Sequence, residues 1–352
     1  MTLEDYFYSF EKNLDVFPGK HDYVSAYKEF KNFMDNEVHK ETKAMAIVLD
    51  DGDIYLNDHS ADHIHMVIEK VSKILWFEDE QKLELNPLEC FILLSAIQIH
   101  DAGHVIGGRD HHEQNAKVFL KKYNCYVVGS PEKKIIYEIA RAHSGKDDPI
   151  GKLQLQEYVS NFRVRMRLLA ALLRLGDEMA DEASRASAFL YDENRIVEES
   201  RLFHAFSISL SSFLPHVNIN EIRMKFNLNK QRCGELYKKP TKEGSIDIYL
   251  LDEIYERTLK TFRECLYYNR FVPDSICLNS VNVIIEFYDD EDFDPFYRTI
   301  GYRLVEKGYP QLQEKSVFDM CGEDLNRDGS KLSGEFVKNQ IIANGNKEQQ
   351  PV

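Results

Sequence analysis

The chain has 352 residues, enough for one large or two ordinary domains, and 43% of them are hydrophobic, which suffices for a sizeable core. Its formal net charge of -15 argues against a surface that binds duplex nucleic acid, because such surfaces need clustered Lys and Arg. Six cysteines without a CxxC pair suit a reducing compartment, and the chain shows no signal peptide and no membrane-spanning run. We therefore expect a cytoplasmic protein.

The N-terminal part is predicted to be helical. Helices are expected over 3–16 and 22–40, separated by Pro18 and Gly19, and a small hairpin is expected over 46–56. The next helix begins near His59 and keeps apolar residues at three-and-four spacing. That spacing places His63 beside its buried stripe.

The most apolar run of the chain leads directly to a His-Asp pair. Asn86 can cap this helix, Pro87 fits its first turn, and the residues up to Ile99 are nearly all apolar. Neighbouring residues do not share a helix face, so His100 and Asp101 can point at one ion only where the helix ends. Gly103 allows the turn that this needs. Taken alone, the pair fits a core histidine beside a capping aspartate equally well.

More potential ligands surround this pair in the sequence. Eight of the twelve histidines lie between His59 and His143. His111 and His112 begin one expected helix, and His143 ends another that begins at Ser130, although both positions also suit histidines with no function. Asp177 ends a further apolar helical run, where an ionised carboxylate is costly unless paired or bound to a metal. Imidazoles and carboxylates on separate helices are a ligand set for a divalent metal.

The pattern changes after residue 199. Strands are predicted over 206–210, 217–226 and 281–287, a polar loop over 238–244, and a helix over 246–269. Residues 324–335 match the acidic positions of a calcium-binding loop, but a single such loop with Lys331 at an apolar position fits an acidic surface loop better. We expect three parts, which are a helical domain over 1–199, an α+β appendage over 200–320 and an acidic, flexible tail over 321–352.

The order His63, His100-Asp101, Asp177 on apolar helices resembles the HD-domain metal-dependent phosphohydrolases, whose motifs are a histidine, a His-Asp pair and an aspartate on separate helices. The flanking residues agree, and the resemblance covers about residues 57–186. Within the superfamily the chain looks most similar to deoxynucleoside triphosphate triphosphohydrolase-like proteins and to HD proteins of prokaryotic conflict systems. The resemblance implies a mainly α fold, an HD helical bundle with a smaller α+β C-terminal appendage.

The resemblance also implies the roles of single residues. One or two divalent ions (Mn, Fe, Zn, Co or Mg) would be held by His63, His100, Asp101 and Asp177, and His112 and His143 are candidates for further ligands or for substrate contact. The candidate catalytic residues are His104, Asp110, His112 and Glu113. The candidate substrate-binding residues, each of which also fits an ordinary surface role, are Arg109, His143, Lys146, Arg174 and Arg185. Ser60 departs from the arginine that many triphosphohydrolases carry at this position.

The implied activity is hydrolysis of nucleotide phosphate esters or anhydrides, with deoxynucleoside triphosphates as the leading substrate class. The alternatives are a phosphodiesterase for cyclic or dinucleotide signals, and a metal-bound nucleotide sensor without turnover. Besides a nucleotide substrate we expect no duplex nucleic acid and no membrane, and either a homo-oligomer or a regulatory protein partner. A role in antiviral defence rests on the resemblance alone.

Overall fold

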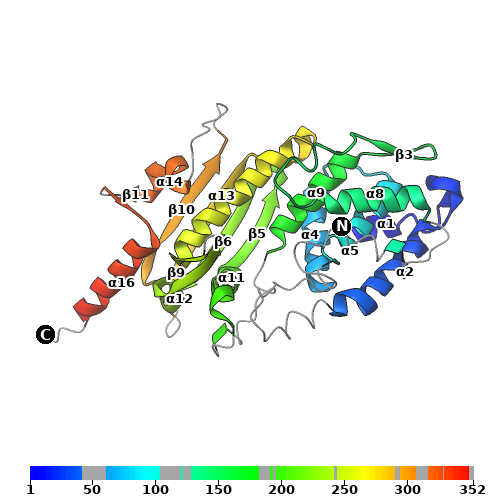
Figure 1. Cartoon of the computed structure of the whole chain (residues 1–352). Helices are drawn as coiled ribbons and strands as arrows, with labels where there is room; N and C mark the ends of the chain where they lie inside the picture. Colours follow the sequence, from blue (N-terminus) through cyan, green and yellow to red (C-terminus); the bar gives the residue numbers. More distant parts are fainter. Residues whose placement is uncertain are drawn as a thin grey trace. The chain divides into compact units, whose positions relative to one another are not determined.

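The computed structural model describes residues 1–41, 61–103, 120–121, 128–181, 191–192, 196–241, 244–289, 294–306, 316–327 and 329–348. In these ranges the chain is mainly α-helical with some β-structure (Figure 1). It falls into two compact units, residues 1–180 with 267–277, and residues 181–266 with 278–352. No helix in the described ranges combines the length and the apolarity that crossing a membrane requires. The hairpin predicted over 46–56 lies outside the described residues.

The first predicted helix is shorter than expected. Helix α1 spans Leu3–Tyr8, and the 3-10 turns η1 (Leu14–Val16) and η2 (Pro18–Lys20) follow it. The backbone turns at Gly19, whose φ of 61° suits a residue without a side chain. The second predicted helix is confirmed as α2 (Tyr23–Phe33), which runs on into a π-helical turn, η3 (Met34–His39).

The core of the first unit is built from α4 (Ala61–Leu75), α5 (Pro87–Ile99), α8 (Ser130–Arg141) and α9 (Met166–Met179). Helix α5 is buried on every side, as its continuous apolar sequence predicts. The predicted cap is confirmed, because the Asn86 side chain accepts the Glu89 N–H at 2.9 Å and the Glu89 carboxylate accepts the Asn86 N–H at 3.1 Å. The described part of the unit also contains two hairpins, β1 (Trp76–Phe77) with β2 (Glu80–Gln81) and β3 (Glu157–Val159) with β4 (Phe162–Val164).

The second unit contains a four-stranded sheet in the order β10-β9-β6-β5. Its strands are β5 (Leu210–His216), β6 (Glu221–Asn229), β9 (Ser280–Tyr288) and β10 (Tyr297–Val305). The central strands β6 and β9 are parallel, and both outer pairs are antiparallel. Helix α13 (Leu250–Asn269) lies over the sheet (Figure 1), where Thr258 and Tyr302 form a buried hydroxyl–hydroxyl hydrogen bond of 2.7 Å.

Several predictions for this part need correction. The strand expected over 206–210 is mostly the end of helix α11 (Glu198–Ser209), because the alternating run is too short to distinguish the two periods. The polar loop expected over 238–244 is a hairpin of β7 (Leu236–Thr241) and β8 (Gly244–Tyr249). Its lysines pair with acidic groups, Lys238 with Asp247 and Lys239 with Glu253, so a polar sequence is stable as strand. The helix predicted from 246 therefore begins four residues later, while the strand predicted over 281–287 is confirmed.

The described part of the second unit also contains short elements. They are η5 (Val217–Ile219), α12 (Lys230–Gly234), α14 (Val317–Met320), α15 (Gly322–Leu325), β11 (Asn326–Arg327), β12 (Ser330–Lys331) and α16 (Gly334–Glu348), with η6 (Asp274–Ile276) belonging to the first unit. Asp324 and Glu335, at the two ends of the calcium-loop pattern, are exposed. Among the described residues, the side chains of this loop do not gather into a group of potential ligands.

Candidate metal centre

An ion pair joins the beginnings of α5 and α9, two of the helices that carry candidate ligands. Glu89 in the first turn of α5 accepts hydrogen bonds from the backbone N–H of Arg165 at 2.9 Å and from its guanidinium at 2.8 and 2.6 Å. Arg165 is the residue that precedes α9. The Glu89 side chain is only 1% exposed, so this charge is bound to its partner inside the protein. The two helices therefore start together, with His100 and Asp177 near their ends.

A glycine lets the third helix approach. A Cβ atom at Gly176 would lie 2.5 Å from Cγ2 of Val71 and 3.4 Å from the carbonyl oxygen of Val67, both in α4. Only a residue without a side chain allows α9 to approach α4 this closely. The next residue in α9 is Asp177, and one turn before Val67 in α4 lies His63. The close approach thus brings a carboxylate from α9 to an imidazole from α4.

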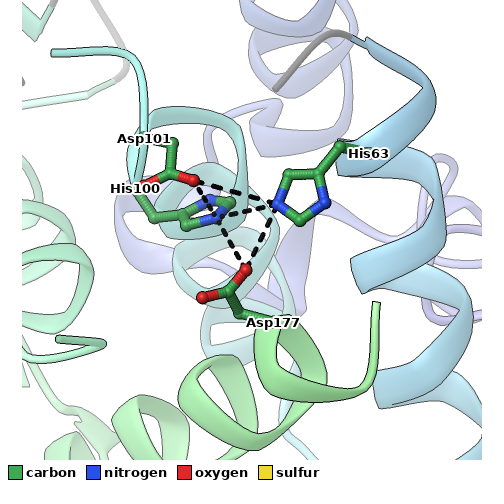
Figure 2. A group of neighbouring side chains, drawn as sticks. All are labelled: His63, His100, Asp101 and Asp177. Atoms are coloured by element: carbon green, nitrogen blue, oxygen red, sulfur yellow. Dashed lines mark hydrogen bonds and ion pairs between the residues drawn. The ribbon is translucent and has the colours of Figure 1, made fainter. Parts of the chain in front are cut away.

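The four residues singled out as metal ligands converge on one point (Figure 2). The Nε2 atoms of His63 and His100 are 3.4 Å apart, and Oδ1 of Asp177 lies 3.2 and 3.5 Å from them. Oδ2 of Asp101 lies 3.9 Å from Nε2 of His63 and 3.4 Å from that of His100. Nitrogen and oxygen atoms bound at about 2.0–2.2 Å to one ion are roughly 3–4 Å from each other. These separations therefore fit a single divalent cation.

The protonation of His100 also fits a ligand. Its Nδ1 lies 2.8 Å from the carbonyl oxygen of Ile97, to which it donates, so the neutral ring would carry its lone pair on Nε2, the nitrogen that faces the centre. Burial by itself would lower the pKa of His100, but the charges of Asp101 and Asp177 raise it to about 9. Burial would likewise raise the pKa of Asp177, but hydrogen bonds with His100 and His63 hold it well below its usual range. The two carboxylates thus favour positive charge here, as a cation-binding site requires.

His143 belongs to this group, although it is not among the four convergent residues. It follows α8 and is buried, and its Nε2 lies 3.4 Å from Oδ1 of Asp101. Its Nδ1 donates to the carbonyl oxygen of Ala140. The two oxygens of Asp101 therefore face different imidazoles, Oδ2 facing His63 and His100, and Oδ1 facing His143. This arrangement allows His143 to orient the carboxylate or to act on a bound substrate.

The loop after His143 is held by residues far along the chain. The Arg174 guanidinium donates to the carbonyl oxygen of Gly145 at 3.2 Å and lies 5.0 Å from the Tyr267 ring centre. Tyr267 also donates its hydroxyl to Asp148 at 2.9 Å, and Arg270 forms an ion pair with Asp148 at 3.0 Å. Asp148 has a φ of 52°, a strained conformation that these bonds stabilise. Sequence reasoning missed Tyr267 and Arg270, because their partners lie more than a hundred residues away.

The remaining candidates divide into described and undescribed residues. Lys146 is exposed in the same loop, and Arg174 is half-buried in α9. Asp181, one turn beyond Asp177 in the sequence, lies after the end of α9 and is bound by Arg257 at 2.7 Å and by Ser207 at 2.8 Å. The candidates that lie outside the described residues are His104, Arg109, Asp110, His112, Glu113 and Arg185.

One further histidine near the centre was not predicted. His39 ends the π-helical turn η3 and is only 2% exposed. Its Nε2 lies 3.0 Å from the side-chain oxygen of Gln98 in α5. Burial lowers its pKa to about 4, and the charges of His100 and Asp101 also act on it. His39 was not singled out because the histidine cluster in the sequence begins only at His59. The sequence feature that could have indicated its burial is its position next to the apolar Val38.

Comparison with known families agrees with this geometry. Residues 53–260 match the family described as HD-CE, a stretch that covers more than half of the chain and contains all four convergent residues. No curated protein matches the chain. The group of His63, His100, Asp101 and Asp177 and the family match both fit a metal-dependent phosphohydrolase. On the extent of that match, the chain belongs to the HD-CE family.

Proposed function

We propose that this protein is a metal-dependent hydrolase of nucleotide phosphate esters or anhydrides, with deoxynucleoside triphosphates as the leading substrate class. The observation that carries the proposal is the convergence of two imidazole nitrogens and two carboxylate oxygens within 4.8 Å of one another, with three of the four residues buried and Asp177 half-buried. Two carboxylates would balance the charge of one divalent ion, and side chains from three different segments would leave positions open for water and substrate.

When bound, a divalent ion supplies a water molecule of lowered pKa and polarises a phosphoryl group. The protein's own part is to hold the ligands and to position the substrate. His63 and His100 present Nε2 to the centre, and Asp177 holds its carboxylate between them. One oxygen of Asp101 faces the same centre, and its other oxygen faces His143. We propose that His143 positions the attacking water or a phosphoryl oxygen.

Phosphate charge needs positive side chains near the centre. Arg174 precedes Asp177 by three residues in α9, so the two side chains lie on neighbouring positions of one helix face. Stacking on Tyr267 and bonding to Gly145 hold its guanidinium in one orientation. Lys146 extends from the same loop and is exposed. We propose these two residues as phosphate contacts.

The proton donor to the leaving oxygen is proposed from the sequence alone. His104 and His112 are the candidates, with Asp110 or Glu113 as supporting carboxylates. Arg109 and Arg185 are further candidates for phosphate binding on the same basis.

A product-resolved nucleotide screen tests the proposal. The purified protein is incubated with Mn²⁺ and with deoxynucleoside triphosphates, ribonucleoside triphosphates, cyclic nucleotides and cyclic dinucleotides, and the products are separated. Release of inorganic triphosphate and nucleoside supports the triphosphohydrolase, whereas monophosphates from cyclic substrates indicate a phosphodiesterase. Nucleotide binding without any product indicates a sensor. Asp177→Asn is the control, since activity that survives in this variant does not come from this centre.

A further inference from the structure

A line of buried hydrogen bonds crosses the first unit and ends beside the candidate metal centre. It begins at Glu4 in α1, which is paired with Lys31 at 2.7 Å. The hydroxyl of Tyr27 in α2 donates to Glu4 at 2.7 Å, and the Gln98 side-chain nitrogen donates to Tyr27 at 3.3 Å. The Gln98 side-chain oxygen lies 3.0 Å from Nε2 of His39. Four segments are thus linked by one chain of polar groups.

The direction of these bonds follows from their outer end. An ionised carboxylate only accepts, so the Tyr27 hydroxyl donates to Glu4 and its oxygen accepts from the Gln98 amide. The amide oxygen is then left to accept, and His39 must carry its proton on Nε2. The half-buried pair of Glu4 and Lys31 therefore sets the tautomer and the ring orientation of His39.

Stability alone does not explain why polar groups occupy these positions. Tyr27 and Gln98 are fully buried and His39 is 2% exposed. Burying a hydroxyl, an amide and an imidazole costs free energy that hydrogen bonds only partly return, whereas apolar side chains would fill the same space without that cost. Satisfied buried networks instead fix one arrangement of the elements that they connect.

One of the connected elements, α5, ends at the candidate metal ligands. Gln98 lies in the last turn of α5, two residues before His100 and three before Asp101. His39 lies in the π-helical turn that interrupts the helical backbone after α2, and such turns recur at functional sites. His39 contacts this last turn directly, through the 3.0 Å hydrogen bond to Gln98, although it does not belong to the convergent group.

We propose that His39 is a positioning residue of the metal centre. Through its hydrogen bond to Gln98 it holds the last turn of α5, and with it the direction in which Asp101 presents its two oxygens. The inference rests on the proposed metal-dependent hydrolase function. Partners that orient metal ligands from behind typically change metal affinity or activity by about 10- to 100-fold when they are removed.

Two tyrosines of α2 provide a matched test. Both are buried, and each donates its hydroxyl to a carboxylate at 2.7 Å, Tyr27 to Glu4 and Tyr23 to Glu132. Only the Tyr27 hydroxyl also accepts from Gln98. Tyr27→Phe and Tyr23→Phe thus remove the same group from the same helix, but only the first breaks the line to His39. We expect Tyr27→Phe to raise the Kd for Mn²⁺ several-fold, and Tyr23→Phe to leave it within about twofold.

Variants of His39 give the larger effect. His39→Leu removes the donor to Gln98, and we expect about a tenfold weaker Mn²⁺ affinity together with a lower kcat. His39→Gln keeps an N–H that can donate to Gln98, and we expect it to restore most of that affinity. Mn²⁺ titration calorimetry on the full chain measures Kd, and thermal melting without metal reports the stability of each variant.

The outcomes separate this inference from the function on which it rests. If the unaltered protein does not bind Mn²⁺, the proposed function fails. If it binds Mn²⁺ but His39→Leu and Tyr27→Phe keep the same Kd, only the positioning role of His39 is wrong. If Tyr23→Phe weakens binding as much as Tyr27→Phe does, the effect is a general loosening of α2 and the inference is again overturned.

Discussion

At the candidate metal centre, the role of each side chain depends on which of its atoms faces a neighbour. Asp101 divides its two oxygens between different imidazoles, one facing His63 and His100, and the other facing His143. Asp177 places one oxygen between His63 and His100. Substitutions of neighbouring residues are therefore expected to differ in their effects on metal binding and turnover.

Asp177 and Asp181 form the sharpest such comparison. Asp177→Asn removes the charge of a candidate ligand, so we expect metal affinity to fall sharply while the helix and the fold are kept. Asp181→Asn removes instead a partner of Arg257 and Ser207, and we expect metal retention to be unchanged. Metal content after dialysis of both purified variants measures this. The opposite ranking would show that the ligand was assigned one helical turn too early.

His143→Ala tests whether His143 acts on the substrate or binds an ion. His143 contacts Asp101 but does not belong to the convergent group, so we expect metal content to hold while turnover falls, by about 10²-fold or more for a lost proton-transfer group. Metal analysis and steady-state rates are measured together. A drop in stoichiometry from about two ions to about one would make His143 a ligand of a second ion.

The burial of Lys70 in α4 predicts how the free energy of unfolding depends on pH. It is 1% exposed, and burial lowers its pKa from 10.5 to about 8. The pKa of Lys70 is lower in the folded state than in the unfolded state, so protonated Lys70 destabilises the fold. This destabilisation is complete below pH 8 and decreases as the pH rises toward 10.5. We expect Lys70→Met to raise the free energy of unfolding at pH 7 by up to about 3 kcal/mol, with the gain vanishing near pH 10.5. Urea titrations of both proteins at these pH values measure it, and a gain that does not depend on pH would contradict the assignment.

At the scale of elements, the centre depends on how closely three helices approach. Glu89 and Arg165 join the beginnings of α5 and α9, and Gly176 allows α9 to lie against α4. Neither contact touches the convergent atoms. Both nevertheless decide where those atoms lie, since buried helices move as rigid elements.

Gly176→Ala is the substitution that tests this. The added methyl would meet Val71 at 2.5 Å, so α9 and α4 must move apart. We expect a loss of about 1–3 kcal/mol in the free energy of unfolding, together with weaker metal binding. Gly234→Ala is the matched control, since a Cβ there meets no atom within 4 Å and its effect should stay within about 0.5 kcal/mol. Equal stability and equal metal affinity of the two variants would refute the close-approach argument.

At the scale of the whole molecule, all four convergent residues belong to one compact unit, residues 1–180 with 267–277. A ligand that binds only the folded form stabilises the unit that contains its site. Two compact units need not unfold in a single transition, so a bound metal can act on one transition and leave another unchanged.

Metal should therefore stabilise part of the molecule selectively. At a free Mn²⁺ concentration of about 100 times Kd, we expect about 2.7 kcal/mol of added stability in the transition that belongs to the unit with the candidate metal centre. Differential scanning calorimetry with and without Mn²⁺ measures the shift, and a chelator should reverse it. Asp177→Asn should show no shift, and an equal shift in this variant would mean that Mn²⁺ binds elsewhere.

The helices that carry the candidate ligands, and the order of these residues, could be predicted from local sequence patterns. Helix α5 and its cap followed from local residues, because Asn86, Pro87 and Glu89 act within one turn. The convergence of His63, His100, Asp101 and Asp177 was predicted because apolar periodicity shows which helices are buried, and a polar residue at such a position needs a reason. The metal and its chemistry remain predictions from that set.

Features that depend on residues far apart in the chain could not be predicted in this way. The strand predicted over 206–210 became helix and the loop over 238–244 became a hairpin, because strand formation depends on pairing and packing more than on local sequence. Tyr267 and Arg270 hold the loop after His143 through contacts across more than a hundred residues. His39 is joined to α5 by a hydrogen bond to Gln98, far along the chain. Helical periods and caps act over a few residues and can be predicted from them, whereas these contacts exist only once the chain has folded.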